Sequence, residues 1–236
     1  MKELEEALLD GRAHLAVHSA KDLPGELPAG LAVLAVPARE DARDVLVGPV
    51  GGLGALPAGA TVATGSPRRA AQILAARPDL RIVPIRGNVG TRLDKLARGD
   101  ADALVLAAAG LRRLGLTPPG ATPLEVEIST PAPGQGFLAL QGRAGDTATA
   151  AAVAALDDPV AHACLRAERA LLAALGGGCL QPVGAFCEPV DGGLRMTAFA
   201  GSDDGTRGER VVRAGALDDP EGLGREAAAA LGSVRA

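Results

Sequence analysis

The chain has 236 residues, 47% of them hydrophobic, which is enough for one large domain or for two or three small ones with buried cores. A formal net charge of −4 and only three aromatic residues argue against a nucleic-acid partner, because phosphate backbones attract a basic excess and single strands need stacking rings. No apolar stretch approaches the length of a membrane span and no apolar signal region follows the charged N-terminus, so we expect no membrane partner and a cytoplasmic location.

The first forty residues predict one helix and two short strands. Leu4, Ala7 and Leu8 lie on one face of a helix over residues 1–10, which Gly11 ends. Strands are expected at residues 14–17 and 31–36. A fold rarely begins with a helix that is already packed, so we expect an upstream part of the first domain to be missing. Either Met1 is a wrongly assigned start or the chain is truncated.

Strands and helices alternate from residue 44 to about residue 116. The expected strands are 45–47, 62–64, 81–85 and 103–106. One helix is expected to begin at Ser66-Pro67 and a second to run over 91–98. This alternation predicts a parallel sheet that is covered by helices. The Gly/Pro-rich stretch 48–59 and the segment 117–122 are expected to be loops.

The pattern changes after residue 160. A long helix over 160–175 is followed by expected strands at 183–187, 194–200 and 209–212, with hairpin signals at 191–193 and 202–205. A helix over 219–231 closes the chain. We interpret this tail as a separate small α+β domain.

Arginine gathers at the start of the helix that begins at Ser66-Pro67. Lysine occurs only at positions 2, 21 and 95, so 21 of the 24 basic residues are arginine. Ser66 is a suitable cap and Pro67 suits the first helical position, yet Arg68 and Arg69 follow at once, where the helix dipole is already positive. An anion would relieve this positive excess. The alternative that both side chains point into water stays open.

The next helix start repeats the arrangement. Arg86 and Arg92 flank a turn that contains Gly87 and Gly90. Free backbone N–H groups together with two guanidinium forks can hold carboxylates. Because both helix starts follow strands of one predicted sheet, we expect them at the same sheet edge. The sequence therefore favours a small anionic ligand.

The three cysteines differ in their settings. Cys164 lies in a predicted helix and Cys187 in a predicted strand, so core packing accounts for both. Cys179 follows three glycines in a loop where a sulfur can be reached, and both a functional and an inert thiol remain open there. No Cys or His spacing is typical of a metal site, so none is expected. His14 and His162 are interpreted as structural.

Four motifs occur in order along the chain: His18-Ser19-Ala20-Lys21-Asp22-Leu23-Pro24, Arg86-Gly87-Asn88-Val89-Gly90-Thr91-Arg92-Leu93, Pro133-Gly134-Gln135-Gly136 and Gly177-Gly178-Cys179-x-x-Pro182. Together they resemble the porphobilinogen deaminase (hydroxymethylbilane synthase) family. The resemblance implies a transferase that joins four porphobilinogen molecules head to tail, with loss of ammonia, into hydroxymethylbilane for porphyrin and haem biosynthesis. It also implies a dipyrromethane cofactor attached through a thioether to Cys179.

The resemblance assigns roles to individual residues. Asp22 matches the catalytic aspartate, which contacts pyrrole nitrogens and stabilises the cation left when the amino group departs. The positions that match cofactor-binding residues are Ser19, Lys21, Asp22, Thr64, Ser66, Arg68, Arg69 and Cys179. Those that match substrate-binding residues are Arg86, Arg92, Arg113, Gln135 and Gly136.

The implied fold is of the α/β class, with two periplasmic-binding-protein-like lobes, the first one incomplete, and a small α+β C-terminal domain. We expect the first lobe at 1–38 and 134–155, the second at 39–133, and the C-terminal domain with the cysteine loop at 156–236, all in a monomer. The family's opening strand, helix and lysine-bearing loop have no counterpart here, and Gly176 stands where an acidic residue is common. We therefore expect less than full activity from this chain.

A second function class remains open beside the enzyme. The chain can also be read as a non-catalytic or impaired two-lobe fragment that only binds anions. Asp22 and Cys179 discriminate between the two, because a binding module needs neither a carboxylate among arginines nor a thiol that tethers a cofactor. Their joint presence favours the enzyme.

Overall fold

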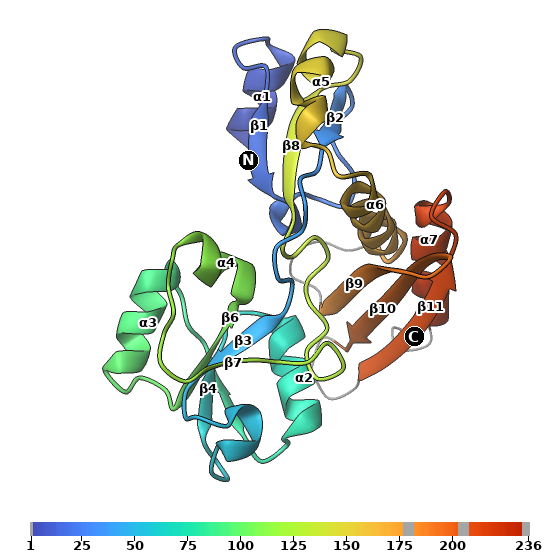
Figure 1. The fold of residues 1–236 in the computed structure, drawn as a ribbon. Helices are drawn as coiled ribbons and strands as arrows, with labels where there is room; N and C mark the ends of the chain where they lie inside the picture. Colours follow the sequence, from blue (N-terminus) through green and yellow to red (C-terminus); the bar gives the residue numbers. More distant parts are fainter. Residues whose placement is uncertain (1, 177–181, 203–207, 233–236) are drawn as a thin grey trace.

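The protein is described by a computed structural model that covers residues 2–176, 182–202 and 208–232. Figure 1 shows three parts, each with its own sheet and helices, around the segments that connect them. The α/β class and the small α+β C-terminal part predicted from the sequence are confirmed. Among the helices in these ranges, none is both long enough and apolar enough to cross a membrane.

The first part contains an antiparallel sheet of three strands in the order β1-β8-β2. Its elements are α1 (Lys2–Leu9), β1 (Ala16–Ser19), the short 3-10 turn η1 (Ala20–Asp22), β2 (Leu31–Ala35), β8 (Leu138–Arg143), α5 (Thr147–Val153) and η3 (Ala154–Leu156). Leu8 of α1 packs against Ala16 and Leu31. Because β8 lies between the other two, β1 and β2 are both edge strands of this sheet.

The second part is a five-stranded sheet in the order β5-β4-β6-β3-β7. Its elements are β3 (Asp44–Val47), η2 (Gly52–Ala55), β4 (Thr61–Ala63), α2 (Pro67–Ala76), β5 (Arg81–Val83), α3 (Val89–Ala97), β6 (Ala103–Ala107), α4 (Ala108–Arg113) and β7 (Ala121–Pro123). Alternate residues of one strand face opposite sides, so Val105 packs with Ile73 of α2, whereas Leu104 packs with Leu93 of α3.

Two expectations for this sheet were wrong. It is mixed rather than parallel, because β3 pairs antiparallel with both β6 and β7. The segment between β3 and β4 carries no α-helix, so the strand–helix–strand units that predict parallel neighbours begin only at β4, and β3 lies beside β6 instead. A strand, Ala121–Pro123, also forms in the segment expected to be a loop, since β3 offers it a free edge.

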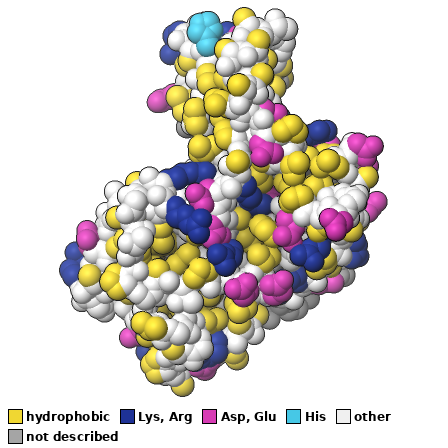
Figure 2. Space-filling view, in the orientation of Figure 1, with side chains coloured by type: hydrophobic (Ala, Val, Ile, Leu, Met, Phe, Trp, Pro, Cys, Tyr) yellow, Lys and Arg dark blue, Asp and Glu magenta, His cyan; other side chains and the backbone are white. Residues whose placement is uncertain are grey.

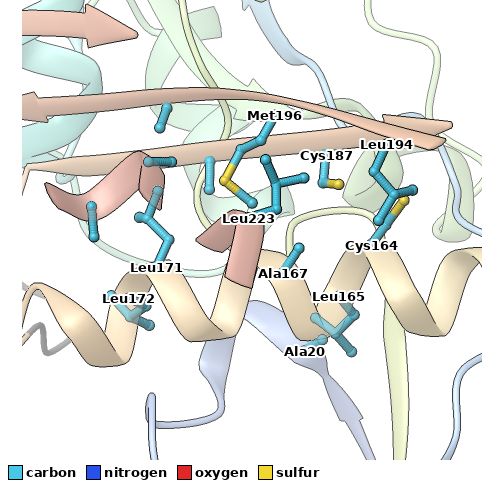
Figure 3. Close-up of a cluster of buried hydrophobic side chains, with 14 of the residues drawn as sticks. Ala20, Cys164, Leu165, Ala167, Leu171, Leu172, Cys187, Leu194, Met196 and Leu223 are labelled. Carbon is cyan, nitrogen blue, oxygen red and sulfur yellow. The ribbon is translucent and has the colours of Figure 1, made fainter. Parts of the chain in front are cut away.

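The third part is an antiparallel sheet, β11-β10-β9, with two helices on one face. Its elements are α6 (Pro159–Ala174), β9 (Val183–Val190), β10 (Gly193–Gly201), β11 (Gly208–Gly215) and α7 (Pro220–Ala230). Figure 3 shows α6 side chains such as Leu171 facing Met196 of the sheet and Leu223 of α7. The hairpin expected at 191–193 is confirmed, whereas the one at 202–205 extends into residues outside the described ranges.

A buried ion pair joins the third part to the connecting segments. Glu168 of α6 accepts hydrogen bonds from the backbone N–H of Gly134 at 2.7 Å and of Cys187 at 2.8 Å. The guanidinium of Arg39 lies 2.9 Å from the same carboxylate and stacks over the Phe137 ring. Burial raises the pKa of Glu168, and the charge of Arg39 partly offsets this effect. One carboxylate thus fixes three segments that are distant in sequence.

In the sheet of the first part only β8 is paired on both edges, whereas in the sheet of the second part β4, β6 and β3 are. This difference predicts a difference in hydrogen exchange. Amides of β1 and β2 should exchange at least about tenfold faster than those of the central strand β6, because edge strands open locally at lower free energy. Mass spectrometry of peptides that cover 15–19, 31–35 and 103–107 measures this. Equal protection in all three would show that the first sheet is as cooperative as the second.

Replacement of Glu168 by glutamine should destabilise the protein by up to about 3–5 kcal/mol, since the largely buried charge of Arg39 would lose its carboxylate. The matched control is Glu188→Gln, which removes an exposed partner of Arg195 and should change stability by about 1 kcal/mol or less. Denaturation followed by far-UV circular dichroism suits a chain without Trp or Tyr. Equal effects of the two substitutions would argue against the buried pair as a tie between parts.

Candidate active site

A cavity of about 190 Å³ lies where all three parts meet. The turn η1 follows β1 directly and is closed by the Leu23 N–H, which donates to the Ala20 carbonyl at 3.1 Å. This turn places Lys21 and Asp22 at the cavity. The complete lining is Lys21, Asp22, Ser66, Arg68, Arg69, Ala132, Pro133, Gln135, Leu172 and Val183. Residues predicted from separate motifs are therefore brought together.

Gly134 allows the connecting segment to pass close to this turn. Its φ of +79° lies in the left-handed region that favours glycine, and a Cβ there would lie 2.8 Å from the backbone of Ala20 and Lys21. A larger residue would therefore push the segment away from the turn. The glycine of the Pro133-Gly134-Gln135-Gly136 motif thus has a packing reason that is tied to the position of Asp22.

The arginine pair at the start of α2 is buried, not solvated. Ser66 caps the helix by accepting from the Arg69 N–H at 3.4 Å. Arg68 and Arg69 are only 3% and 7% exposed, and both contact the carboxylate of Asp44 at the start of β3. The nearest distances are 2.8 Å from Arg68 Nη1 and 2.7 Å from Arg69 Nη2. The alternative in which both arginines point into water is therefore wrong.

The charges around the cavity do not cancel. Burial alone would raise the pKa of Asp44, but the charges of Arg68 and Arg69 outweigh it and hold that pKa well below its usual range. The pKa of Lys21 is lowered by burial and then by Arg69, while Asp22 acts in the opposite direction. Three basic side chains, those of Arg68, Arg69 and Lys21, stand against the two carboxylates of Asp44 and Asp22, so basic groups outnumber acidic ones here. The cavity is therefore suited to an anionic ligand.

The second helix start adds a neighbouring cavity of about 460 Å³, which Ser66, Arg69, Arg86 and Arg92 line together with Gly65, Pro84, Ile85 and Gly87. β4 and β5 are parallel neighbours, which confirms that both helix starts lie at one sheet edge. Burial lowers the pKa of Arg92, as does the nearby charge of Arg69. Because Ser66 and Arg69 line both cavities, the arginines form one continuous basic surface.

Some predicted residues lie elsewhere or serve local structure. Ser19 is exposed at the end of β1, and the buried Thr64 Oγ1 accepts from the Ser66 N–H at 3.1 Å. Arg113 Nη2 donates to the Gly136 carbonyl at 2.7 Å, so these two are joined outside the cavity beside Asp22. Cys179 lies outside the described residues. Cys164 and Cys187 are buried thiols, as expected.

A third cavity, of about 410 Å³, carries mostly paired charges. Figure 2 shows acidic and basic side chains gathered on one face where the three parts meet. Three arginines that line this cavity already hold carboxylates: Arg39 with Glu168, Arg43 with Asp41, and Arg195 with Glu188. It therefore offers an anion little free charge. Within the described ranges no cluster of His, Cys, Asp and Glu is arranged to hold a metal ion.

Sequence reasoning missed Asp44, which organises the arginine pair, and Ser129, whose hydroxyl donates to the same carboxylate at 2.8 Å. It also missed Arg39 and Glu168. The available signal for Asp44 was a carboxylate at the first position of an apolar strand, in the same unit as a helix that begins with two arginines. For Glu168 the only signal was an acidic residue on the apolar face of α6.

Solved structures with a similar chain path include periplasmic binding proteins. A putative methionine-binding lipoprotein from Bacillus subtilis matches 66% of this chain and 74% of its own, with 14% identity and a TM-score of 0.44. The periplasmic aliphatic sulphonate binding protein SsuA from Escherichia coli matches 72% of this chain and 56% of its own, with 16% identity and a TM-score of 0.43. Likeness at this level says nothing about the chemistry of a site.

The sequence comparisons are more specific. Residues 1–151 match the family model "Porphobilinogen deaminase, dipyromethane cofactor binding domain", and residues 162–232 match "Porphobilinogen deaminase, C-terminal domain". The porphobilinogen deaminase of Roseiflexus castenholzii is 50% identical over 94% of this chain and 73% of its own length. That of Thiobacillus denitrificans is 49% identical over 95% and 74%. The chain thus spans about three quarters of these relatives, and it belongs to the porphobilinogen deaminase family, whose members are transferases that form hydroxymethylbilane with a dipyrromethane cofactor.

Proposed function

We propose that the cavity beside Asp22 is where this transferase joins its substrate units, with Asp22 as the catalytic carboxylate. Loss of ammonia from porphobilinogen leaves positive charge on the substrate carbon that forms the new bond. A carboxylate held at a fixed position stabilises such charge more effectively than water does, because it needs no reorganisation. The observation that carries this proposal is the presence of Asp22 beside Lys21, Arg68 and Arg69 in one cavity.

The residues present fit the dipyrromethane cofactor. This group carries carboxylate side chains, which suit the excess positive charge of the cavity, and pyrrole N–H groups, which suit the acceptor Asp22. When bound, it supplies the pyrrole carbon to which the first substrate is joined. We propose that Cys179 holds it by a thioether. Leu172 and Val183, which precede and follow residues 177–181, line the same cavity and support this assignment.

Lys21 from the first part and Ser66 from the second would contact the cofactor, with Ser19 and Thr64 supporting the turn and the helix start beside them. Arg86 and Arg92 would bind acetate and propionate groups of the incoming substrate. Arg113, Gln135 and Gly136 are proposed substrate contacts as well. The bond from Arg113 to the Gly136 carbonyl uses only one of its N–H groups, so others remain for a carboxylate.

We further propose that the first lobe comprises 1–38 and 134–155, the second 39–133 and the C-terminal domain 156–236. Two buried cysteines that remain thiols are typical of a reducing compartment, which supports a cytoplasmic location. We also propose that the protein is a monomer. Subcellular fractionation and sedimentation test these two assignments.

The second candidate, a fragment that binds anions without catalysis, rests on the same arginines. A binding module would need only the positive charge, and a carboxylate among the arginines would weaken its affinity for anions. The presence of Asp22 in the cavity therefore favours the enzyme. The two candidates differ in whether Asp22 is needed for turnover.

Asp22→Asn should lower the rate of hydroxymethylbilane formation by about 100- to 1000-fold relative to the parent chain, because the stabilising charge is lost while the shape is kept. Folding should be unchanged, as measured by circular dichroism. The matched control is Glu26→Gln, an exposed carboxylate four residues further along that does not line the cavity. A rate for Asp22→Asn within a factor of a few of the parent would assign Asp22 to the turn alone.

Cofactor attachment should occur at Cys179 alone. Protein produced in cells with an active pathway should show one dipyrromethane adduct by intact-mass measurement, and Cys179→Ser should abolish it. Cys164→Ala is the control and should retain the adduct, since this thiol is buried in the core. An adduct that persists in Cys179→Ser would overturn the assignment.

A further inference from the structure

Asp44 is a fully buried carboxylate that no motif of the sequence singled out. Arg68 approaches it with Nη1 and Nη2, and Arg69 approaches it with Nε and Nη2. Ser129 Oγ donates to it at 2.8 Å, and Gln135 Nε2 does so at 2.8 Å. Six donor atoms from two segments, α2 and residues 129–135, therefore converge on one side chain.

This arrangement leaves the arginines only partly used. Each guanidinium has five N–H groups. Asp44 accepts two N–H groups from each arginine. A third N–H group of Arg68 donates to the Thr130 carbonyl, and a third N–H group of Arg69 donates to the Val105 carbonyl. Among the described residues, two N–H groups on each arginine thus remain for a ligand. One carboxylate also balances only one of the two positive charges.

The chemistry of Asp44 itself points away from proton transfer. Its carboxylate is surrounded by donors and lies between two guanidinium groups, so it stays ionised and accepts only hydrogen bonds. Ser129 and Gln135 belong to the segment that returns from the second part to the first, and Gln135 Nε2 also donates to the Ala42 carbonyl at 2.7 Å on the outgoing segment. Asp44 therefore joins the arginine pair to both connections.

We propose that Asp44 is a positioning residue for carboxylate recognition: it holds Arg68 and Arg69 so that their remaining N–H groups and one net positive charge face the cavity beside Asp22. The carboxylate recognition itself rests on the proposed function. Without Asp44 the two side chains would keep their charge but lose their fixed direction. Their affinity for a ligand carboxylate would fall because ordering them would then oppose binding.

The first experiment measures the arginines directly, without substrate. Phenylglyoxal modifies accessible guanidinium groups, and peptide mapping locates the products. Arg68 and Arg69, which are mostly buried and held on Asp44, should react slowly in the parent and clearly faster in folded Asp44→Asn. The matched control is Asp41→Asn, which also removes a carboxylate bonded to two arginines, Arg43 and Arg112, but lies away from this cavity. Protection in Asp44→Asn equal to that in the parent would overturn the proposal.

Two further variants, one of which keeps the net charge of the parent, cover the case in which Asp44→Asn does not fold. Arg68→Gln retains Asp44 and should leave Arg69 protected. Asp44→Asn combined with Arg68→Gln has the same net charge as the parent at this cluster, yet it removes the group that holds Arg69. Arg69 should become reactive only in the double variant. Equal protection of Arg69 in these two proteins would again overturn the proposal.

The second experiment measures porphobilinogen affinity in a Cys179→Ser background, where no adduct forms. Asp44→Asn should weaken binding by roughly 10- to 100-fold, whereas Asp41→Asn should have little effect. In a double-mutant cycle the effects of Asp44→Asn and Arg69→Gln should be clearly less than additive, since one acts through the other; a general structural role would make them additive. If the parent binds no porphobilinogen, the proposed function fails, and arginine reactivity still decides the role of Asp44.

Discussion

The contact between Asp44 and the paired guanidinium groups of Arg68 and Arg69 sets the geometry of the cavity beside Asp22. Charged groups of this kind are costly to bury unless they are paired and hydrogen-bonded, and here the partners come from β3, from α2 and from the segment that carries Ser129. The contact forms only when these three segments are in place. The position of the arginines is therefore a property of the folded second part as a whole.

The same principle joins the third part to the rest of the molecule. The buried Glu168 is paired with the largely buried Arg39, and its carboxylate also accepts hydrogen bonds from the backbone N–H groups of Gly134 and Cys187. Gly134 passes so close to Ala20 that the turn with Lys21 and Asp22 and the connecting segment pack as one unit. Two buried carboxylates, those of Asp44 and Glu168, thus determine where the side chains that line the cavity lie. The substrate is proposed to contact a third carboxylate, that of Asp22.

The distribution of charge agrees with a product that becomes more anionic with each added pyrrole. Arginines from two successive helix starts line neighbouring cavities, and Arg69 and Ser66 belong to both. Arginine suits this role because its planar fork binds carboxylates bidentately and stays charged when it is partly buried. The third cavity, with its paired charges, shows the contrast, since its arginines are bonded to carboxylates of the protein itself.

The sequence by itself determined the helices α1, α2, α3, α6 and α7 and most of the strands, because periodicity and caps such as Ser66, Asn88 and Asp158 act locally. It did not predict the short helices α4 and α5 or the strand β8. It also determined the family through its motifs, and it placed both arginine-rich helix starts at one edge. Only the tertiary structure decided that β3 runs antiparallel to β6, that Arg68 and Arg69 are buried on Asp44, and that Glu168 reaches Gly134. These contacts join residues that are far apart in the sequence, for example 24 positions for Asp44 and Arg68 and 85 positions for Asp44 and Ser129. Such contacts depend on how complete elements pack, and no local pattern of residue types encodes that.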